Sequence, residues 1–181
     1  MFAASKTAAA AAGTPPPPTD PQFNYVTMLL HGDGTNGAQN NTFTDSSTNN
    51  FTITRNGNTT QGSFSPYGSN WSNYFDGSGD YLILSSSADL SPESSDFCIE
   101  AWVYITTTPT SYQTIFSASA SGIFFGNLSS STDFGLRQRT GSDLIVSTPP
   151  PTNTWTHVAV SRSGTNLRMG DSGIACPRCE V

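Results

Sequence analysis

The stretch NYFDGSGDYLILSSSADLSPESSDFCIEAWVYI, from Asn73 to Ile105, decides the fold that we expect for this chain. Its last nine residues alternate with a period of two, which predicts a β-strand. One face carries Phe97, Ile99, Ala101, Val103 and Ile105, and the other carries Cys98, Glu100, Trp102 and Tyr104. Because Trp102 and Tyr104 make the second face apolar as well, the pattern predicts a central strand that is covered on both sides. A shorter strand is expected nearby at Tyr81 to Leu84.

The composition favours an all-β protein. Of 181 residues, 35% are hydrophobic and only 11% are charged, with Ser, Thr, Asn and Gly in place of the missing charge. Thr, Tyr, Phe and Trp suit pleated surfaces, whereas strong helix formers are scarce outside an N-terminal alanine run. The net charge is −6 and the seven basic residues are scattered, so the sequence shows no stripe for nucleic acid. No apolar run is long enough to span a membrane.

Three segments are predicted along the chain. Residues 1–22 are rich in alanine and proline and are expected to form a disordered linker, with a secretory signal as the alternative. Residues 23–169 are expected to form one domain, and residues 170–181 an atypical tail. Within the domain, Tyr25 to His31 and Phe51 to Arg55 are predicted strands. Asn56-Gly57 is typical of a two-residue hairpin turn.

The second half repeats the rhythm of short strands and turns, which indicates a sandwich or barrel. The candidates are Gln113 to Ser117, Ile123 to Gly126, Asp133 to Arg139 and Leu144 to Val146. Trp155 to Ser161 alternates again and predicts a second central strand. On this basis we expect Trp102 and Trp155 to be mostly buried.

Five pieces of the sequence together resemble one family. They are Leu29 to Gly34, FTDSSTNNFTITRNG from Phe43, YFDGSGDYL from Tyr74, DFCIEAWVY from Asp96 and TWTHVAVSRSGTNLR from Thr154. They resemble the laminin G-like branch of the concanavalin A-like lectin/glucanase superfamily, in a version common in tailed-phage structural proteins and marine viral sequences. The resemblance implies a jelly-roll sandwich of two antiparallel sheets, often with calcium at one rim, that binds glycans or proteins without catalysis.

The same resemblance implies a place and partners for the chain. A phage protein of this kind would lie on the virion surface and bind a glycan, a host-surface protein or other virion proteins; otherwise an extracellular place is expected. The family pattern continues with further strands after Met169, where this sequence reads GDSGIACPRCEV, so the domain is expected to lack its last strands. The pair Cys176 and Cys179 has the spacing of a zinc or redox site but no further ligands, and we interpret it as incidental. Cys98 is expected to be a small buried side chain.

The carboxylates argue against an enzyme. Retaining glucanases use two carboxylates about 5 Å apart, on one strand face in this superfamily, and the matching motif is absent. Glu100 is instead expected to pair with Arg162 or to cap backbone groups, and His31 and His157 are expected to be structural. The predicted function is therefore a non-enzymatic binding or adhesion module. The alternatives are a fragment of a glycoside hydrolase and a spacer domain without ligand.

Two sets of side chains are candidates for binding. The polar stretch from Asp33 to Asn50 offers oxygen ligands for calcium, namely Asp33, Asn36, Asp45 and Asn49. Asx turns explain the same composition, and the sequence leaves both interpretations open. Asp76 and Asp80 are expected to close a turn. For glycan binding the candidates are the loop aromatics Tyr67, Trp71 and Tyr112, which could equally cover the ends of the sandwich.

Overall fold

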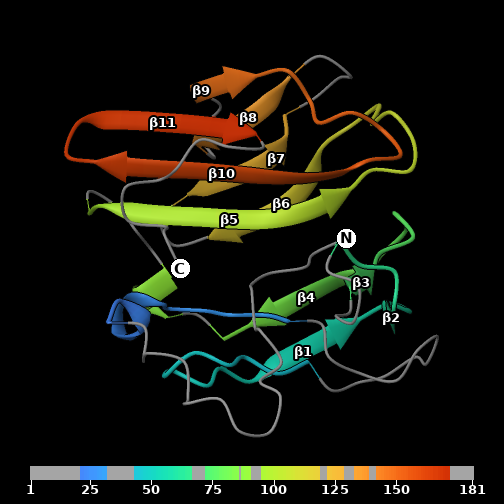
Figure 1. Ribbon diagram of the computed structural model, residues 1–181, viewed down its shortest axis with the longest axis horizontal. Helices are drawn as coiled ribbons and strands as arrows, with labels where there is room; N and C mark the ends of the chain where they lie inside the picture. The colour runs from blue at the N-terminus through green and yellow to red at the C-terminus, as the bar shows by residue number, and fades with distance from the viewer. Residues whose placement is uncertain are drawn as a thin grey trace, which may run out of the picture. The chain divides into compact units, whose positions relative to one another are not determined.

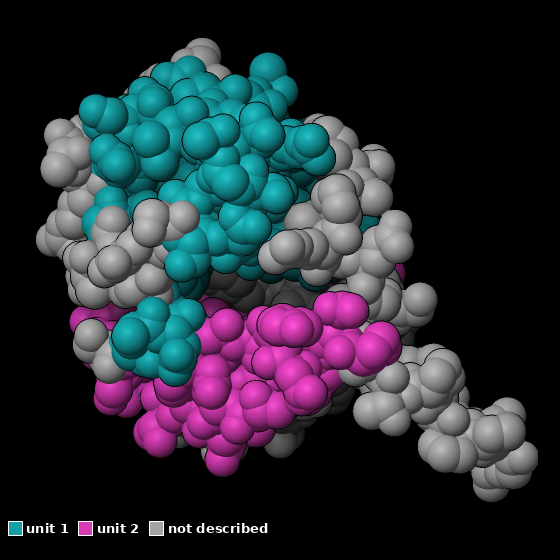
Figure 2. Space-filling model, turned by 90° about the vertical axis from the view of Figure 1, so that its left-hand side faces the viewer, with its two compact units in different colours: residues 1–2, 86–180 teal, residues 3–85, 181 magenta. Residues whose placement is uncertain are grey.

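The computed structural model describes residues 21–31, 43–66, 72–85, 87–90, 95–118, 122–128, 133–138 and 142–171 (Figure 1). These residues fall into two compact units, an N-terminal unit that ends at residue 85 and a C-terminal unit that begins after it (Figure 2). All the paired strands run antiparallel, and the helices of the described residues are two short 3-10 turns. The chain is therefore all-β, as predicted. None of these helices could cross a membrane. The domain limits at residues 23 and 169 stay predictions.

The C-terminal unit contains two sheets. The first sheet has three strands in the order β11-β10-β5, and the second has four strands in the order β6-β7-β8-β9. The strands of the first are β5 (Phe97–Tyr104), β10 (Trp155–Ser163) and β11 (Asn166–Asp171). Those of the second are β6 (Gln113–Ala118), β7 (Ile123–Asn127), β8 (Phe134–Gln138) and β9 (Asp143–Ser147). The short turn η2 (Ala88–Leu90) precedes them.

The two sheets share one hydrophobic core, which makes this unit a sandwich. Both contribute buried side chains, and Phe125, Leu136 and Val160 are completely inaccessible to solvent. The other members are Ala101, Val103, Ala118, Ile123, Phe134 and Val158. They occupy alternate positions along each strand, since a period of two places every second side chain on the same face. Ala101 and Val103 therefore share one face of β5, as the alternation predicted, and this face is the one turned to the core.

The position of β5 differs from the prediction. In the described part of the chain β5 pairs with β10 alone and lies at the edge of its sheet, whereas β10 is central as expected. Trp102 and Trp155 lie on the face turned away from the core, and both are mostly buried, as predicted. The ring centroids of Trp102 and His157 are 5.4 Å apart, and those of Trp155 and Tyr104 are 5.5 Å apart. The rings on this second face of β5 pack against rings of β10. The face can therefore be apolar although, among the described residues, β5 has a neighbouring strand on one side only.

The N-terminal unit consists of shorter elements. They are the 3-10 turn η1 (Phe23–Tyr25) and the strands β1 (Ile53–Asn56), β2 (Thr60–Gly62), β3 (Ser72–Tyr74) and β4 (Tyr81–Leu84). Strand β1 pairs with β4, and β2 pairs with β3. The strand predicted from Tyr25 to His31 is reduced to a single bridge between Leu30 and Asp45.

The hairpin predicted at Asn56-Gly57 is wrong, because β1 and β2 do not pair with each other. The chain does turn at Gly57, whose φ is 74°. Asp80 then accepts a hydrogen bond of 2.7 Å from the backbone N–H of Asn58. This bond ties the turn to the start of β4, so the local turn signal is satisfied while the strand partner comes from much later in the sequence.

We expect alanine at Gly135 to be strongly destabilising. A Cβ atom there would lie 2.1 Å from the backbone oxygen of Ile145 on β9, so the two strands would have to move apart. The expected loss in the free energy of unfolding is about 3 kcal/mol, measured by urea denaturation. Gly164→Ala is the control, because its Cβ meets no atom within 4 Å and only its positive φ of 60° is strained. That change should cost about 1 kcal/mol. Equal losses would show that the sheet accommodates a side chain at Gly135.

Candidate functional site

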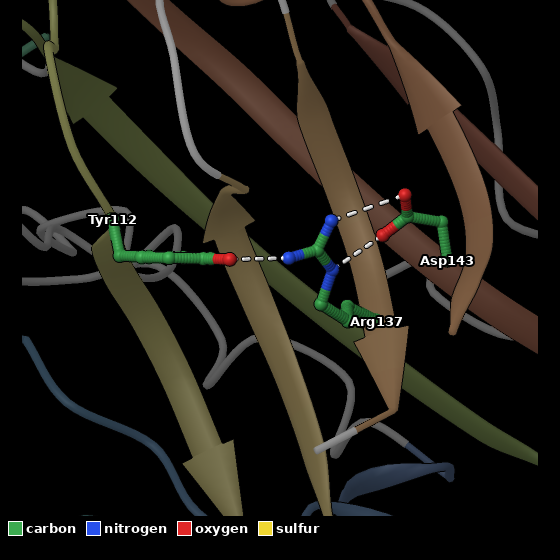
Figure 3. A network of polar contacts seen from close by, with 3 residues as sticks. All are labelled: Tyr112, Arg137 and Asp143. Carbon is green, nitrogen blue, oxygen red and sulfur yellow. Dashed lines mark hydrogen bonds and ion pairs between the residues drawn. The ribbon is translucent and has the colours of Figure 1, made fainter. Parts of the chain in front are cut away.

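Three polar side chains meet on the outer face of the four-stranded sheet (Figure 3). Tyr112 directly precedes β6, Arg137 lies on β8, and Asp143 begins β9 directly opposite Arg137. Leu136, next to Arg137, faces the core, so Arg137 must face outward. The strand order thus brings together residues that are far apart in the sequence.

Arg137 is the centre of this group, which we call the Tyr112 site. Its Nε donates to Oδ1 of Asp143 at 2.5 Å, and its Nη2 donates to Oδ2 at 3.1 Å, which is a bidentate ion pair. Its Nη1 donates to the Tyr112 hydroxyl at 2.5 Å. The hydrogen bond from Arg137 lowers the pKa of Asp143 below its usual value, and Asp143 in turn raises the pKa of Arg137. Both groups therefore stay charged over the whole neutral range.

Tyr112 is held in place and yet accessible. Phe124 on β7 contacts it in an edge-to-face arrangement with 5.7 Å between ring centroids, and Arg137 fixes its hydroxyl. Even so, 55% of Tyr112 is exposed to solvent. An immobilised and exposed aromatic ring beside hydrogen-bonding groups is suited to stacking against a ligand, because little entropy is lost when the ligand binds.

Of the predicted glycan-binding residues, the structure places Tyr112 directly before β6 of this sheet, while Tyr67 and Trp71 lie outside the described residues. Arg137 and Asp143 were not predicted. Their pairing depends on a register shift between β8 and β9, where one extra residue of β9 places Asp143 opposite Arg137. The sequence does contain a signal, an arginine and an aspartate that flank one turn, but alternation alone does not reveal their register.

Asp45 organises a second group, in the N-terminal unit. Only 2% of Asp45 is exposed. Its Oδ1 accepts hydrogen bonds from the backbone N–H of Leu29 at 2.9 Å and of Ser47 at 3.0 Å. Its Oδ2 accepts from the backbone N–H of Phe51 at 2.9 Å and from the Ser47 hydroxyl at 2.8 Å. Burial raises the pKa of Asp45, but these hydrogen bonds outweigh it and hold the pKa below its ordinary value.

This arrangement bears on the predicted calcium site. A carboxylate has about four acceptor positions, and four donors already use those of Asp45. The Asn49 amide donates to the backbone oxygen of Thr27, which also lies 3.0 Å from the hydroxyl oxygen of Ser47. Asp45 and Asn49 are thus brought together, whereas Asp33 and Asn36 lie outside the described residues. The donors around Asp45 fit an Asx turn better than a bound cation.

Asp76 and Asp80 form a turn, as expected. Asp80 accepts hydrogen bonds from the backbone N–H of Asn58 and of Asp76, and Asp76 accepts one from Ser78. Among the described residues, the structure brings no three His, Cys, Asp or Glu side chains together in a way that could hold a metal ion.

The structure corrects two smaller predictions. The partner of Glu100 is His157, whose Nε2 lies 3.3 Å from Oε2 of Glu100. Arg162 instead donates to the backbone oxygen of Ser95 and lies 5.2 Å from the Phe97 ring centroid. The reason is the register, which places Arg162 opposite Phe97 at the far end of β5 from His157. Cys98 is half-buried and disulfide-bonded, and is not a free apolar side chain.

Comparison with known proteins adds one finding. Residues 76–169 match a laminin G-like family model that is described as the concanavalin A-like lectin/glucanases superfamily. The match covers strands β4 to β10 and the first four residues of β11. No curated protein and no solved structure matches the chain significantly.

Proposed function

The chain belongs to the concanavalin A-like lectin/glucanases superfamily, and from this premise we propose that it is a non-enzymatic module that binds a glycan. Laminin G-like domains are typically binding modules without enzymatic activity. The observation that supports a glycan in particular is Tyr112, whose ring is fixed by Arg137 and Phe124 while more than half of it stays exposed. Sugars present C–H faces that stack on such rings and hydroxyl groups that bind to neighbouring polar side chains.

A glycan array tests this proposal. The full chain is applied to immobilised oligosaccharides, and Tyr112→Ala is compared with Tyr81→Ala. Tyr81 lies on β4 and is similarly exposed at 51%, so it controls for the loss of a surface tyrosine. We expect Tyr112→Ala to weaken binding about tenfold or more, which corresponds to roughly 1.4 kcal/mol, and Tyr81→Ala to leave it unchanged. Binding that both variants retain would move the glycan site away from Tyr112.

The absence of catalysis belongs to the same proposal. A retaining glycoside hydrolase needs a second carboxylate about 5 Å from the first. Among the described residues, Glu100 has a polar contact with His157 on the neighbouring strand and not with a second carboxylate. Incubation with laminarin or agar should therefore release no reducing sugar. Release that Glu100→Gln abolishes would support the hydrolase alternative, and failure to bind any probe would favour a spacer domain.

Calcium stays a prediction for the Asp45 loop, and melting curves decide it. A bound ion would raise the melting temperature in millimolar calcium by mass action, and Asp45→Asn would remove the rise. Equal curves in calcium and in chelator would leave Asp45 as the turn residue that its four hydrogen bonds describe.

We also propose that the module acts on a virion surface, where a glycan of the host would be its partner. This step rests on the resemblance to phage structural proteins. Detection of the chain by antibody on intact purified virions supports it, and its absence from them contradicts it.

A further inference from the structure

We propose that Arg137 and Asp143 determine the specificity of the Tyr112 site, and that this site selects neutral sugars that carry two adjacent hydroxyl groups. The inference rests on the proposed glycan binding and adds the class of sugar. The class of sugar is inferred from the hydrogen-bond donors and acceptors of the three side chains that their mutual contacts leave available.

The remaining positions comprise both donors and acceptors. A guanidinium has five N–H groups, and the contacts with Asp143 and Tyr112 use three of them. The Tyr112 hydroxyl accepts from Arg137, so its own proton is left to be donated. Each oxygen of Asp143 accepts one bond from Arg137 and has a further lone pair. Figure 3 shows Tyr112 and Asp143 on opposite sides of the guanidinium.

A pair of adjacent sugar hydroxyls is complementary to this arrangement. One hydroxyl can donate its proton to Asp143 while its neighbour accepts from Arg137 or from Tyr112, because each hydroxyl is both a donor and an acceptor. Bonds that involve a charged partner are the stronger kind. The exposed part of the Tyr112 ring supplies an apolar surface beside them. The site therefore offers a stacking surface and a polar edge in one place.

The charges favour a neutral sugar over an acidic one. The ion pair has no net charge, and its carboxylate is the more accessible member, with 40% of the Asp143 side chain exposed against 18% for Arg137. A sialic acid or a sulfated sugar would bring its own negative charge to this carboxylate, in a chain whose net charge is already −6. The lowered pKa of Asp143 keeps the carboxylate ionised at mildly acidic pH.

Arg137 is also a positioning residue, because the same guanidinium orients Asp143 and fixes the hydroxyl of Tyr112. Lysine carries the same charge but has no planar fork, so it cannot hold both partners at once. Arg137→Lys should therefore weaken binding, although the charge of the site is preserved.

The test uses the full chain on an array that carries neutral mannose-, glucose- and galactose-terminated oligosaccharides beside sialylated and sulfated ones. The variants are Asp143→Asn, which removes the charge and keeps the shape, and Tyr112→Phe, which removes only the hydroxyl. Asp89→Asn on η2 and Tyr81→Phe on β4 are the matched controls, since both residues are exposed. Melting temperatures close to that of the wild type confirm that each variant is folded.

We expect the wild type to bind neutral glycans, Asp143→Asn to lose about tenfold in affinity, and Tyr112→Phe to lose severalfold. Both controls should bind like the wild type. A free methyl mannoside should compete, and sialic acid should not. Preference for acidic glycans, or variants that bind like the wild type, would overturn this inference while glycan binding itself stands. A wild-type chain that binds no glycan on the array would overturn both.

Discussion

Replacement of Asp45 by alanine is expected to lower the free energy of unfolding by about 3 to 5 kcal/mol, because it removes the acceptor of several buried donors. The backbone N–H groups of Leu29, Ser47 and Phe51 all donate to this one carboxylate. Hydrogen bonds to a charged acceptor are worth more than neutral ones, and each donor left without a partner adds a further cost. Urea denaturation followed by circular dichroism measures the change.

A control variant and a pH series test whether the ionised carboxylate of Asp45 is the cause of this loss of stability. Asp76→Ala removes an exposed carboxylate of the same unit that accepts one hydrogen bond from Ser78, so it should cost less than about 1 kcal/mol. The pKa of Asp45 is lowered in the folded chain, so its contribution is fully present above about pH 4 and is lost as the pH falls through the lowered value. Asp45→Asn should remove this acid dependence. A loss below 1 kcal/mol in Asp45→Ala would show that water replaces the carboxylate.

The second large effect is expected at Phe125, whose replacement by alanine should cost about 3 to 5 kcal/mol. Phe125 is completely buried between the sheets and contacts Phe134 edge to face, with 5.3 Å between ring centroids. Alanine would leave a cavity that the strands of both sheets cannot fill without moving. The same urea denaturation measures the loss.

Phe124→Ala is the matched control, because this ring belongs to the preceding residue and points to the opposite, outer face, where it contacts Tyr112. Because the Phe124 ring is only half-buried, Phe124→Ala should lower the free energy of unfolding by about 1 to 2 kcal/mol. Comparable losses at the two positions would mean that the outer face is packed as tightly as the core.

The elements of the fold could be predicted from the sequence better than their pairing. Alternation at Phe97 to Ile105 correctly placed Ala101 and Val103 on one face of β5, because the alternation of side chains between the two faces of a strand is a local property. The edge position of β5 could not be predicted, since it depends on which strands come to lie beside it. At Asn56-Gly57 the local turn signal was correct about the turn and wrong about the hairpin, for the same reason.

At the candidate sites, too, single residues could be predicted from the sequence, whereas their partners could not. Asp45 stood out in the sequence, but the choice between an ion and a turn depended on donors such as Leu29, which lies 16 residues away. Tyr112 was named as a candidate, whereas Arg137 and Asp143 became visible only with the register of β8 and β9. Side chains that act together across strands are specified by topology, which single-sequence patterns do not encode.

The arrangement of the two sheets also has a consequence for the order in which the chain folds. Strands β6 to β9 join consecutive neighbours by short connections, whereas the residues that pair between β5 and β10 are more than fifty positions apart. The entropy cost of closing so long a loop has to be met before the contacts between β5 and β10 can form. The four-stranded sheet of β6 to β9 should therefore assemble first. During synthesis β5 would then wait without its partner until β10 has left the ribosome. Pulse-labelled hydrogen exchange should show early protection in β6 to β9 and late protection in β5.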